Sequence, residues 1–95
     1  MNSYDFSEQT AVITGGCNGI GAAVVKKLVH SGARVCIWDM NIEDCEDEIA
    51  KLPNDTCQKA QTDVSDFESV TAALKKTKSA FGTVDVLINS AGVAG

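Results

Sequence analysis

The chain has 95 residues, fewer than the roughly 100 to 150 that a single domain most often contains, so we expect one folding unit over residues 1–95 and no second domain. The composition, with 44% hydrophobic and 22% charged residues and one proline, is that of a globular protein and excludes a disordered or collagen-like chain. The net charge of −5 and the pI of about 4.6 argue against nucleic acid and anionic membrane surfaces as partners, because both need concentrated lysine and arginine.

We expect neither membrane insertion nor secretion from this sequence. Its apolar stretches are far shorter than the roughly 20 residues that span a bilayer. Residues 1–9 contain Asp5 and Glu8 and lack the basic and apolar regions of a secretory signal, which predicts a cytoplasmic protein. Because there is no C-x-x-C pair and the single histidine is His30, we interpret the cysteines as free thiols and expect no metal site (Cys17, Cys36, Cys45 and Cys57).

The first half of the chain predicts strand, turn, helix, strand and helix. A β-branched run over residues 11–14 precedes a glycine cluster, and apolar residues then recur at helical spacing until Gly32, which is placed to end that helix. Residues 34–38 predict a second strand that ends at Asp39. Apolar residues at helical spacing over residues 42–52 predict a second helix, which Pro53 stops.

The second half of the chain predicts a strand, a helix and a last strand. Residues 58–62 are a weaker third strand, and Ser65 with Glu68 makes a capping box that opens the following helix. Gly82 closes this helix, and residues 84–89 are the fourth strand. We expect three of the five aromatic side chains to lie in the core (Trp38, Phe67 and Phe81).

Strands that alternate with helices predict an α/β fold with a doubly wound parallel sheet, because each helix must return the chain to the same end of the sheet. With the first helix and the later helices on opposite faces, the strand order is 3-2-1-4. The switch point then lies between the first and fourth strands, where such folds bind ligands. No repeat, linker or low-complexity tract indicates a domain boundary.

The strongest chemical signal is the glycine cluster between the first strand and the first helix, residues 14–21. Its spacing is G-x-x-x-G-x-G rather than the G-x-G-x-x-G of many dinucleotide folds, but both let the backbone turn tightly and approach a pyrophosphate. The helix that begins near Gly19 points free N–H groups at the phosphates. The alternative is a glycine-rich turn without a ligand. We interpret Cys17 as a small residue that the loop tolerates, without a catalytic role.

Asp39 stands about 20 residues beyond the glycine loop, at the end of the second strand. A carboxylate there can accept hydrogen bonds from the hydroxyl groups of the adenosine ribose, and it repels a 2′-phosphate. An NADP site needs a nearby cation, whereas residues 16–18 are uncharged and Met40 and Asn41 follow the aspartate. NAD is therefore the predicted cofactor. The alternative is a surface aspartate that only shapes the start of the next helix, which Asn41 can already cap.

Together these motifs resemble the short-chain dehydrogenase/reductase family, from about Phe6 to the last residue. The resemblance is carried by T-G-x-x-x-G-x-G at residues 14–21, by Asp39, by Asp63-Val64 after the third strand, and by Asn-Ser-Ala-Gly at residues 89–92. It implies a Rossmann fold in which the glycine loop holds the pyrophosphate, Asp-Val meets the adenine and the last segment braces the sheet beside the ribose. The cofactor-binding residues predicted in this way are Gly15, Cys17, Asn18, Gly19, Ile20, Gly21, Asp39, Met40, Asp63, Val64, Asn89, Ala91 and Gly92. Position 90 is serine where the family more often has asparagine, although neighbouring backbone does most of the work there.

The resemblance also implies an activity whose catalytic residues are not in this chain. The family uses a tyrosine, a lysine four residues later and a serine, all beyond the fourth strand, whereas the only tyrosine here is Tyr4, with Glu8 at the fourth position after it. We therefore expect residues 1–95 to be the N-terminal dinucleotide-binding half of one Rossmann domain, inactive alone, from a longer and homo-oligomeric parent enzyme. That parent would transfer hydride between NAD and an alcohol or carbonyl substrate, such as a 3-oxoacyl thioester, a small alcohol or a sugar. The alternative is a stand-alone nucleotide-binding or interaction module without catalysis.

Overall fold

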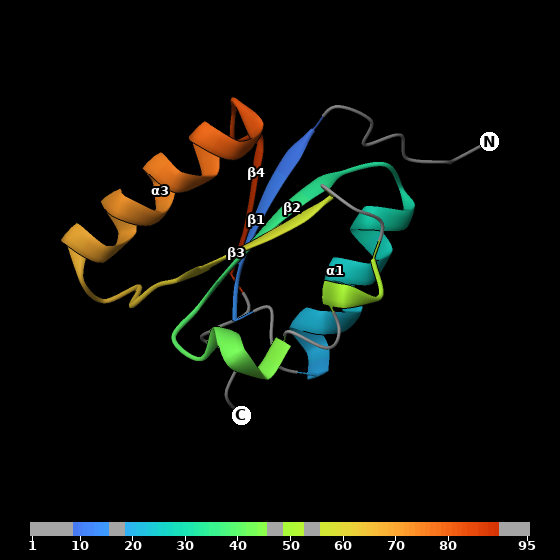
Figure 1. The fold of residues 1–95 in the computed structure, drawn as a ribbon, viewed down its shortest axis with the longest axis horizontal. Coiled ribbons are helices and arrows are strands. Elements are labelled where there is room, and N and C mark those ends of the chain that lie inside the picture. Colours follow the sequence, from blue (N-terminus) through green and yellow to red (C-terminus); the bar gives the residue numbers. More distant parts are fainter. Residues whose placement is uncertain (1–8, 16–18, 46–48, 53–55, 90–95) are drawn as a thin grey trace.

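The structure, a computed structural model, describes residues 9–15, 19–45, 49–52 and 56–89. In chain order its elements are β1 (Thr10–Thr14), α1 (Gly19–His30), β2 (Arg34–Asp39), the 3-10 helix η1 (Ile42–Cys45), β3 (Cys57–Gln61), α3 (Phe67–Phe81) and β4 (Val86–Asn89) (Figure 1). All strand pairs are parallel and the order in the sheet is β3-β2-β1-β4. This confirms the predicted doubly wound α/β fold. Among the described residues, no helix is both long enough and apolar enough to cross a bilayer.

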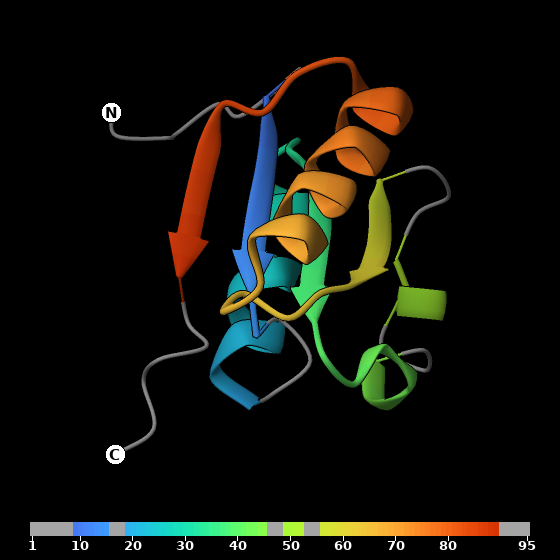
Figure 2. The ribbon, with the colours of Figure 1, turned by 90° about the vertical axis from the view of Figure 1, so that its left-hand side faces the viewer.

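The sheet separates two hydrophobic clusters, because successive side chains of a strand point to opposite faces. Figure 2 shows α3 in front of the sheet and α1 behind it. The cluster on the α1 side is built around Ile13, Val25, Val29, Ala33, Val35 and Ile37. The cluster on the α3 side is built around Val12, Cys36, Trp38, Ala60, Ala73 and Phe81. The central strands β1 and β2 therefore contribute to both layers of the core, which explains their nearly continuous apolar sequence.

The start of α3 differs from the prediction. Its N-cap is Asp66, whose side chain accepts a hydrogen bond from the backbone N–H of Glu68 over 3.0 Å. Ser65 instead donates both its backbone N–H and its hydroxyl to the carboxylate of Asp63. The predicted capping box is therefore wrong, because the Ser65 hydroxyl is bound to another residue. The predicted end is confirmed: Gly82 has φ 87°, a left-handed conformation that favours glycine, and donates its N–H to Lys78.

One of the three aromatic residues expected in the core lies on the surface. Trp38 and Phe81 are buried, whereas Phe67 is 84% exposed. Phe67 is the first residue of α3, and Figure 1 shows this end of the helix farther from the strands than its last turn. The helical spacing that groups Phe67 with the inner residues of α3 therefore extends beyond the part of the helix that contacts the sheet.

The segment between β2 and β3 only partly follows the predicted helix over residues 42–52. It begins as the 3-10 helix η1, and helical backbone is present again at residues 49–50, while residues 46–48 lie outside the described part. Ile49 and Leu52 pack against the α1 side of the core, as their apolar spacing predicts. The outer strands also begin at slightly different positions from those predicted, β3 one residue earlier and β4 two residues later.

Candidate functional site

The carboxyl ends of the four strands lie at one edge of the sheet, as the parallel arrows of Figure 2 show. This edge carries all the predicted cofactor-binding residues that the structure describes. They are Gly15 after β1, Gly19, Ile20 and Gly21 at the start of α1, Asp39 and Met40 at the end of β2, Asp63 and Val64 after β3, and Asn89 at the end of β4. Cys17, Asn18, Ala91 and Gly92 lie outside the described residues. Open α/β sheets bind ligands at this edge.

The turn after β1 has the geometry that its glycine predicts. Gly15 has φ 71°, a conformation that side chains disfavour, and its N–H donates to the carbonyl oxygen of Trp38 over 2.8 Å. The helix α1 begins at Gly19, and its first turn contains no acidic residue. The helix therefore places no carboxylate of its own beside the N–H groups of that turn and the positive end of the helix dipole. This environment favours an anionic ligand.

Side-chain hydrogen bonds attach β4 to β1 at both ends. At the site edge, the Thr14 hydroxyl donates to Oδ1 of Asn89 over 2.7 Å. At the opposite edge, the backbone N–H of Thr10 donates to Oδ2 of Asp85, and the N–H of Asp85 donates to the carbonyl of Thr10. Asn89 is therefore held in position next to the glycine turn.

Asp39 and Asp63 follow neighbouring strands and are joined through the backbone. The N–H of Thr62 donates to the carbonyl oxygen of Asp39 over 2.9 Å, so the position of Asp63 is fixed relative to that of Asp39. Oδ1 of Asp39 also accepts the N–H of Asn41 over 3.0 Å. Such a bond to the residue two positions later shapes a local turn. Asp39 therefore shapes the start of the segment after β2, which is the structural role named as the alternative to cofactor binding. This role does not prevent the carboxylate from binding a ligand.

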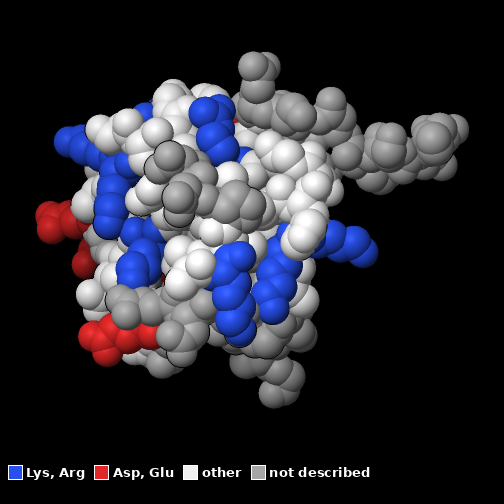
Figure 3. Space-filling model, turned by 45° about the vertical axis from the view of Figure 1, so that its right-hand side comes forward, with Lys and Arg blue, Asp and Glu red and all other residues white. Residues whose placement is uncertain are grey.

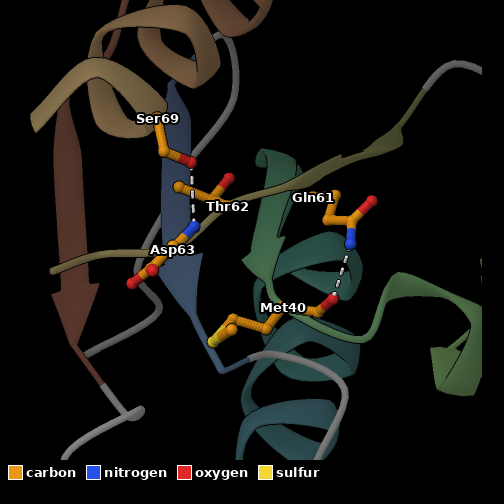
Figure 4. Close-up of a pocket in the computed structure, with 5 residues that line it drawn as sticks. All are labelled: Met40, Gln61, Thr62, Asp63 and Ser69. Atoms are coloured by element: carbon orange, nitrogen blue, oxygen red, sulfur yellow. Dashed lines mark hydrogen bonds between the residues drawn. The ribbon is translucent and has the colours of Figure 1, made fainter. Parts of the chain in front are cut away.

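A hollow of about 290 Å³ lies beside these strand ends and is lined by Met40, Gln61, Thr62, Asp63 and Ser69 (Figure 4). The Met40 side chain, 59% exposed, extends across it towards Asp63. Small-ligand pockets usually measure about 300 to 1,000 Å³, so this hollow fits one part of a dinucleotide rather than the whole molecule. Val64 is 49% exposed and is not among the described lining residues.

A second hollow, of about 360 Å³, lies next to the first and is lined by Met40, Asn41, Ile42, Glu43 and Gln61. The amide Nε2 of Gln61 donates to the carbonyl of Met40 over 3.1 Å, and both residues line both hollows. Among the described lining residues the charged ones are Asp63 and Glu43, both acidic.

On the face that Figure 3 shows, lysine and arginine side chains form separate groups with uncharged side chains between them.

Asp63 is held by three hydrogen bonds from the beginning of the α3 segment. Its Oδ1 accepts the backbone N–H of Ser65 over 2.9 Å and the Ser65 hydroxyl over 2.6 Å, and its own N–H donates to Oγ of Ser69 over 2.9 Å. The two bonds from Ser65 hold the pKa of the Asp63 carboxyl below its usual value. Asp63 is therefore an ionised hydrogen-bond acceptor at neutral pH.

The sequence did not indicate Ser69 or Gln61, because their contributions depend on where α3 begins and on the register between β2 and β3.

Comparisons with known proteins agree with this fold. A family profile described as short chain dehydrogenase matches residues 9–95. A cis-4-hydroxycyclohexanecarboxylate dehydrogenase of Sinomonas cyclohexanicum is 39% identical over 92 residues, which cover 94% of this chain and 36% of the relative. The 2-dehydro-3-deoxy-L-rhamnonate dehydrogenase (NAD(+)) of a Sphingomonas species is 36% identical over 90 residues, 95% of this chain and 35% of that protein. The chain thus spans about a third of the length of these curated relatives.

Solved structures of similar proteins share the arrangement. A short-chain dehydrogenase/reductase, glucose/ribitol dehydrogenase, from Brucella melitensis superposes with a TM-score of 0.90 at 26% identity, covering 99% of this chain and 40% of the other. A 3-ketoacyl-(acyl-carrier-protein) reductase from the same organism, complexed with NADH, has a TM-score of 0.81 at 29% identity, with coverages of 87% and 34%. The C-domain of a bacterial malonyl-CoA reductase with NADP has a TM-score of 0.82 at 35% identity, with coverages of 94% and 15%. Both nicotinamide dinucleotides thus occur among similar structures.

Proposed function

This chain belongs to the short-chain dehydrogenase family, and on that basis we propose that it binds the adenosine and pyrophosphate end of NAD in an oxidoreductase acting on an alcohol or carbonyl substrate. The observation that carries the proposal is a hollow of about 290 Å³ lined by Asp63, with Asp39 at the end of the neighbouring strand β2, directly before the lining residue Met40. When bound, the nicotinamide ring supplies the hydride chemistry. This chain's part is to hold and orient the other end of the cofactor.

Each part of the site edge fits one part of the dinucleotide. The turn at Gly15 and the first N–H groups of α1 would hold the pyrophosphate, because both suit a close anionic ligand. The Asp39 carboxylate would accept hydrogen bonds from the ribose hydroxyls, and the hollow beside Asp63 would hold the base, with Met40 against the ring. Asn89, fixed by Thr14, would brace the sheet next to the ribose. The same proposal includes the predicted residues outside the described part, Cys17, Asn18, Ala91 and Gly92.

Charge favours NAD over NADP in this proposal. A 2′-phosphate would lie near Asp39 and Glu43, and no described residue lining the two hollows is basic. A second negative group at that position would therefore be repelled rather than paired. The relative whose name includes NAD(+) is consistent with this preference, although the similar structure with NADP shows that the fold accommodates both cofactors.

The test is a comparison of kcat/KM for NAD and NADP in the product of the complete gene, with a panel of secondary alcohols, sugars and 3-oxoacyl thioesters. We expect NAD to be preferred by about 5- to 150-fold, the range that corresponds to one unpaired polar group. The double variant Asp39→Ala with Met40→Arg should shift the preference towards NADP, and Glu68→Gln, which removes a carboxylate from the exposed side of α3, should not.

Equal kcat/KM for the two cofactors in the unaltered protein would contradict the assignment of NAD. Absence of dinucleotide binding would contradict the proposed function as a whole. The 95-residue chain by itself should oxidise no NADH with any of these carbonyl substrates, because it contains no candidate proton donor at the family's catalytic position.

A further inference from the structure

The turn that follows β2 is tied to the end of β3 by one side-chain hydrogen bond. Asp39 is the last residue of β2 that pairs with β3, where its partner is Gln61, and its carbonyl oxygen accepts the N–H of Thr62 over 2.9 Å. Met40 lies beyond this pairing, and its carbonyl oxygen accepts a hydrogen bond from Nε2 of Gln61 over 3.1 Å (Figure 4). The Gln61 amide therefore extends the attachment of β2 to β3 by one residue past the paired positions.

Burial does not account for this bond. Gln61 and Met40 are both exposed, so water can satisfy the amide and the carbonyl equally well. What the bond does is fix the backbone of Met40, whose side chain extends across the first hollow. The next residue, Asn41, donates its N–H to Oδ1 of Asp39 over 3.0 Å. The direction of the Asp39 carboxylate is thus linked, through the turn over residues 39–41, to the amide of Gln61.

We propose that Gln61 is a positioning residue that holds this turn so that the Asp39 carboxylate selects a ribose diol against a ribose 2′-phosphate. This inference rests on the proposed function, because it assumes that the adenosine ribose lies at Asp39. A carboxylate held in place accepts hydrogen bonds from the hydroxyls without first having to be ordered. It also stays close to a 2′-phosphate and repels it, whereas a carboxylate on a released turn can move away. Gln61 itself is uncharged, so its effect on selectivity comes from position alone.

The test compares the dissociation constants of NAD and NADP, measured by calorimetry on the product of the complete gene. Gln61→Met keeps the length of the side chain and removes the donor. This variant should bind NAD about two- to tenfold more weakly, the effect of one hydrogen bond, while NADP binding changes less, so the selectivity for NAD falls. Gln58→Met is the matched control, because it makes the same change towards the opposite end of β3, and it should leave both constants unaltered.

A second variant separates positioning from direct contact with the cofactor. Gln61→Asn keeps an amide beside the hollows, but its side chain is one methylene shorter and should no longer bond the Met40 carbonyl. We expect Gln61→Asn to lose selectivity as Gln61→Met does. Full selectivity in Gln61→Asn would mean that the amide acts on the cofactor directly, and this would overturn the positioning role.

Hydrogen exchange of the Asn41 N–H, followed by NMR without cofactor, gives a readout that does not depend on binding. Gln61→Met should speed this exchange, because release of Met40 weakens the bond from Asn41 to Asp39. The inference requires both faster exchange and lower selectivity, and the absence of either overturns it. Equal weakening of NAD and NADP binding would likewise show a merely structural role.

The inference and the proposed function fail in different ways. If the unaltered protein binds neither dinucleotide, the proposed function fails and the inference falls with it. If the unaltered protein prefers NAD and Gln61→Met keeps the whole of that preference, the inference alone fails.

Discussion

Trp38 donates its indole N–H to the hydroxyl oxygen of Thr77 over 3.1 Å and so connects β2 with α3 inside the core. The Thr77 hydroxyl donates in turn to the carbonyl of Ala73 over 2.8 Å, so its donor and acceptor functions are both used. The carbonyl of Trp38 accepts the N–H of Gly15, and the next residue is Asp39. A single tryptophan therefore links the helix layer to both the glycine turn and the carboxylate at the site edge.

Thr77→Val should lower the free energy of unfolding by about 1 to 3 kcal/mol, because it leaves the buried indole N–H without a partner while preserving the shape of the side chain. Thr71→Val is the matched control: Thr71 lies on the same helix and its hydroxyl makes the same bond to the carbonyl four residues earlier, but among the described residues it is not the residue that accepts the Trp38 indole N–H. Denaturant unfolding followed by the fluorescence of the single tryptophan measures both variants. Equal losses in the two variants would show that the bond to Trp38 contributes nothing.

Asp66→Ala should lower the free energy of unfolding by about 0.5 to 2 kcal/mol, because it removes the side chain that caps α3. Glu68→Ala should lower it by less than half as much, since Glu68 contributes only a favourable charge in the first helical turn. Thermal or chemical unfolding of the two variants distinguishes this arrangement from the capping box suggested by the sequence. A larger loss for Glu68→Ala than for Asp66→Ala would favour the capping box.

The topology could be predicted from the sequence because it depends on a repeated pattern. Runs of β-branched residues alternate with segments whose apolar residues recur at helical spacing, and this alternation determines that the strands pair in parallel. A parallel sheet with helices on both faces has few possible strand orders. The local features at the start of α3 could not be predicted in the same way. Ser65 and Asp66 are both good N-cap residues, and the choice depends on Asp63, which accepts both hydrogen bonds from Ser65. Likewise, the exposure of Phe67 depends on how far α3 extends past the sheet, which helical spacing does not encode.

In the candidate site, too, some residues could be predicted from the sequence and others could not. Gly15, Asp39 and Asp63 are recognisable in sequence because each follows directly after a predicted strand. Gln61 and Ser69 complete the hollow through tertiary geometry, Gln61 by bonding to Met40 across neighbouring strands and Ser69 by bonding back to Asp63 from the first turn of α3. Neither Gln61 nor Ser69 stands in a sequence motif that indicates a contribution to the hollow.

Stability should fall above about pH 9 in part because of Cys57. Burial, together with the nearby Cys36, raises the pKa of the Cys57 thiol to about 12, from an ordinary value of 9.0. Between these values the unfolded chain loses the thiol proton while the folded chain keeps it, so stability is fully present below pH 9 and falls as pH rises through this window. The slope from this one group is at most about 1.4 kcal/mol per pH unit.

Urea unfolding at pH 7.5, 9 and 10.5 tests this expectation when the unaltered chain is compared with Cys57→Ala, which lacks the titrating group. The difference in unfolding free energy between the two should become smaller as pH rises. A difference that stays constant across the three pH values would show that Cys57 ionises as easily in the folded chain as in the unfolded one.

The 95-residue chain should self-associate through β4, an edge strand of the described sheet. Leu87 is 64% exposed on this strand, and among the described strands β4 pairs only with β1. An apolar strand edge with unpaired backbone groups is a template for pairing with another chain. Leu87→Lys should therefore reduce concentration-dependent association measured by sedimentation. Phe67→Lys, at an apolar residue that is more exposed but lies on a helix, should have the smaller effect, and the reverse order would contradict the role of β4.

The pairing of β1 with β4 determines when the sheet can be completed as the chain is synthesised. Thr10 and Asp85, which are hydrogen-bonded to each other, are separated by 75 positions, whereas β1 and β2 are separated by one short helix. Closing a loop of that length comes late in folding compared with local helices and neighbouring strands. On a ribosome, where elongation takes seconds for a segment of this size, β2 emerges well before β4. β1, in which every residue is buried in the finished sheet, therefore keeps one unpaired side until β4 has been synthesised.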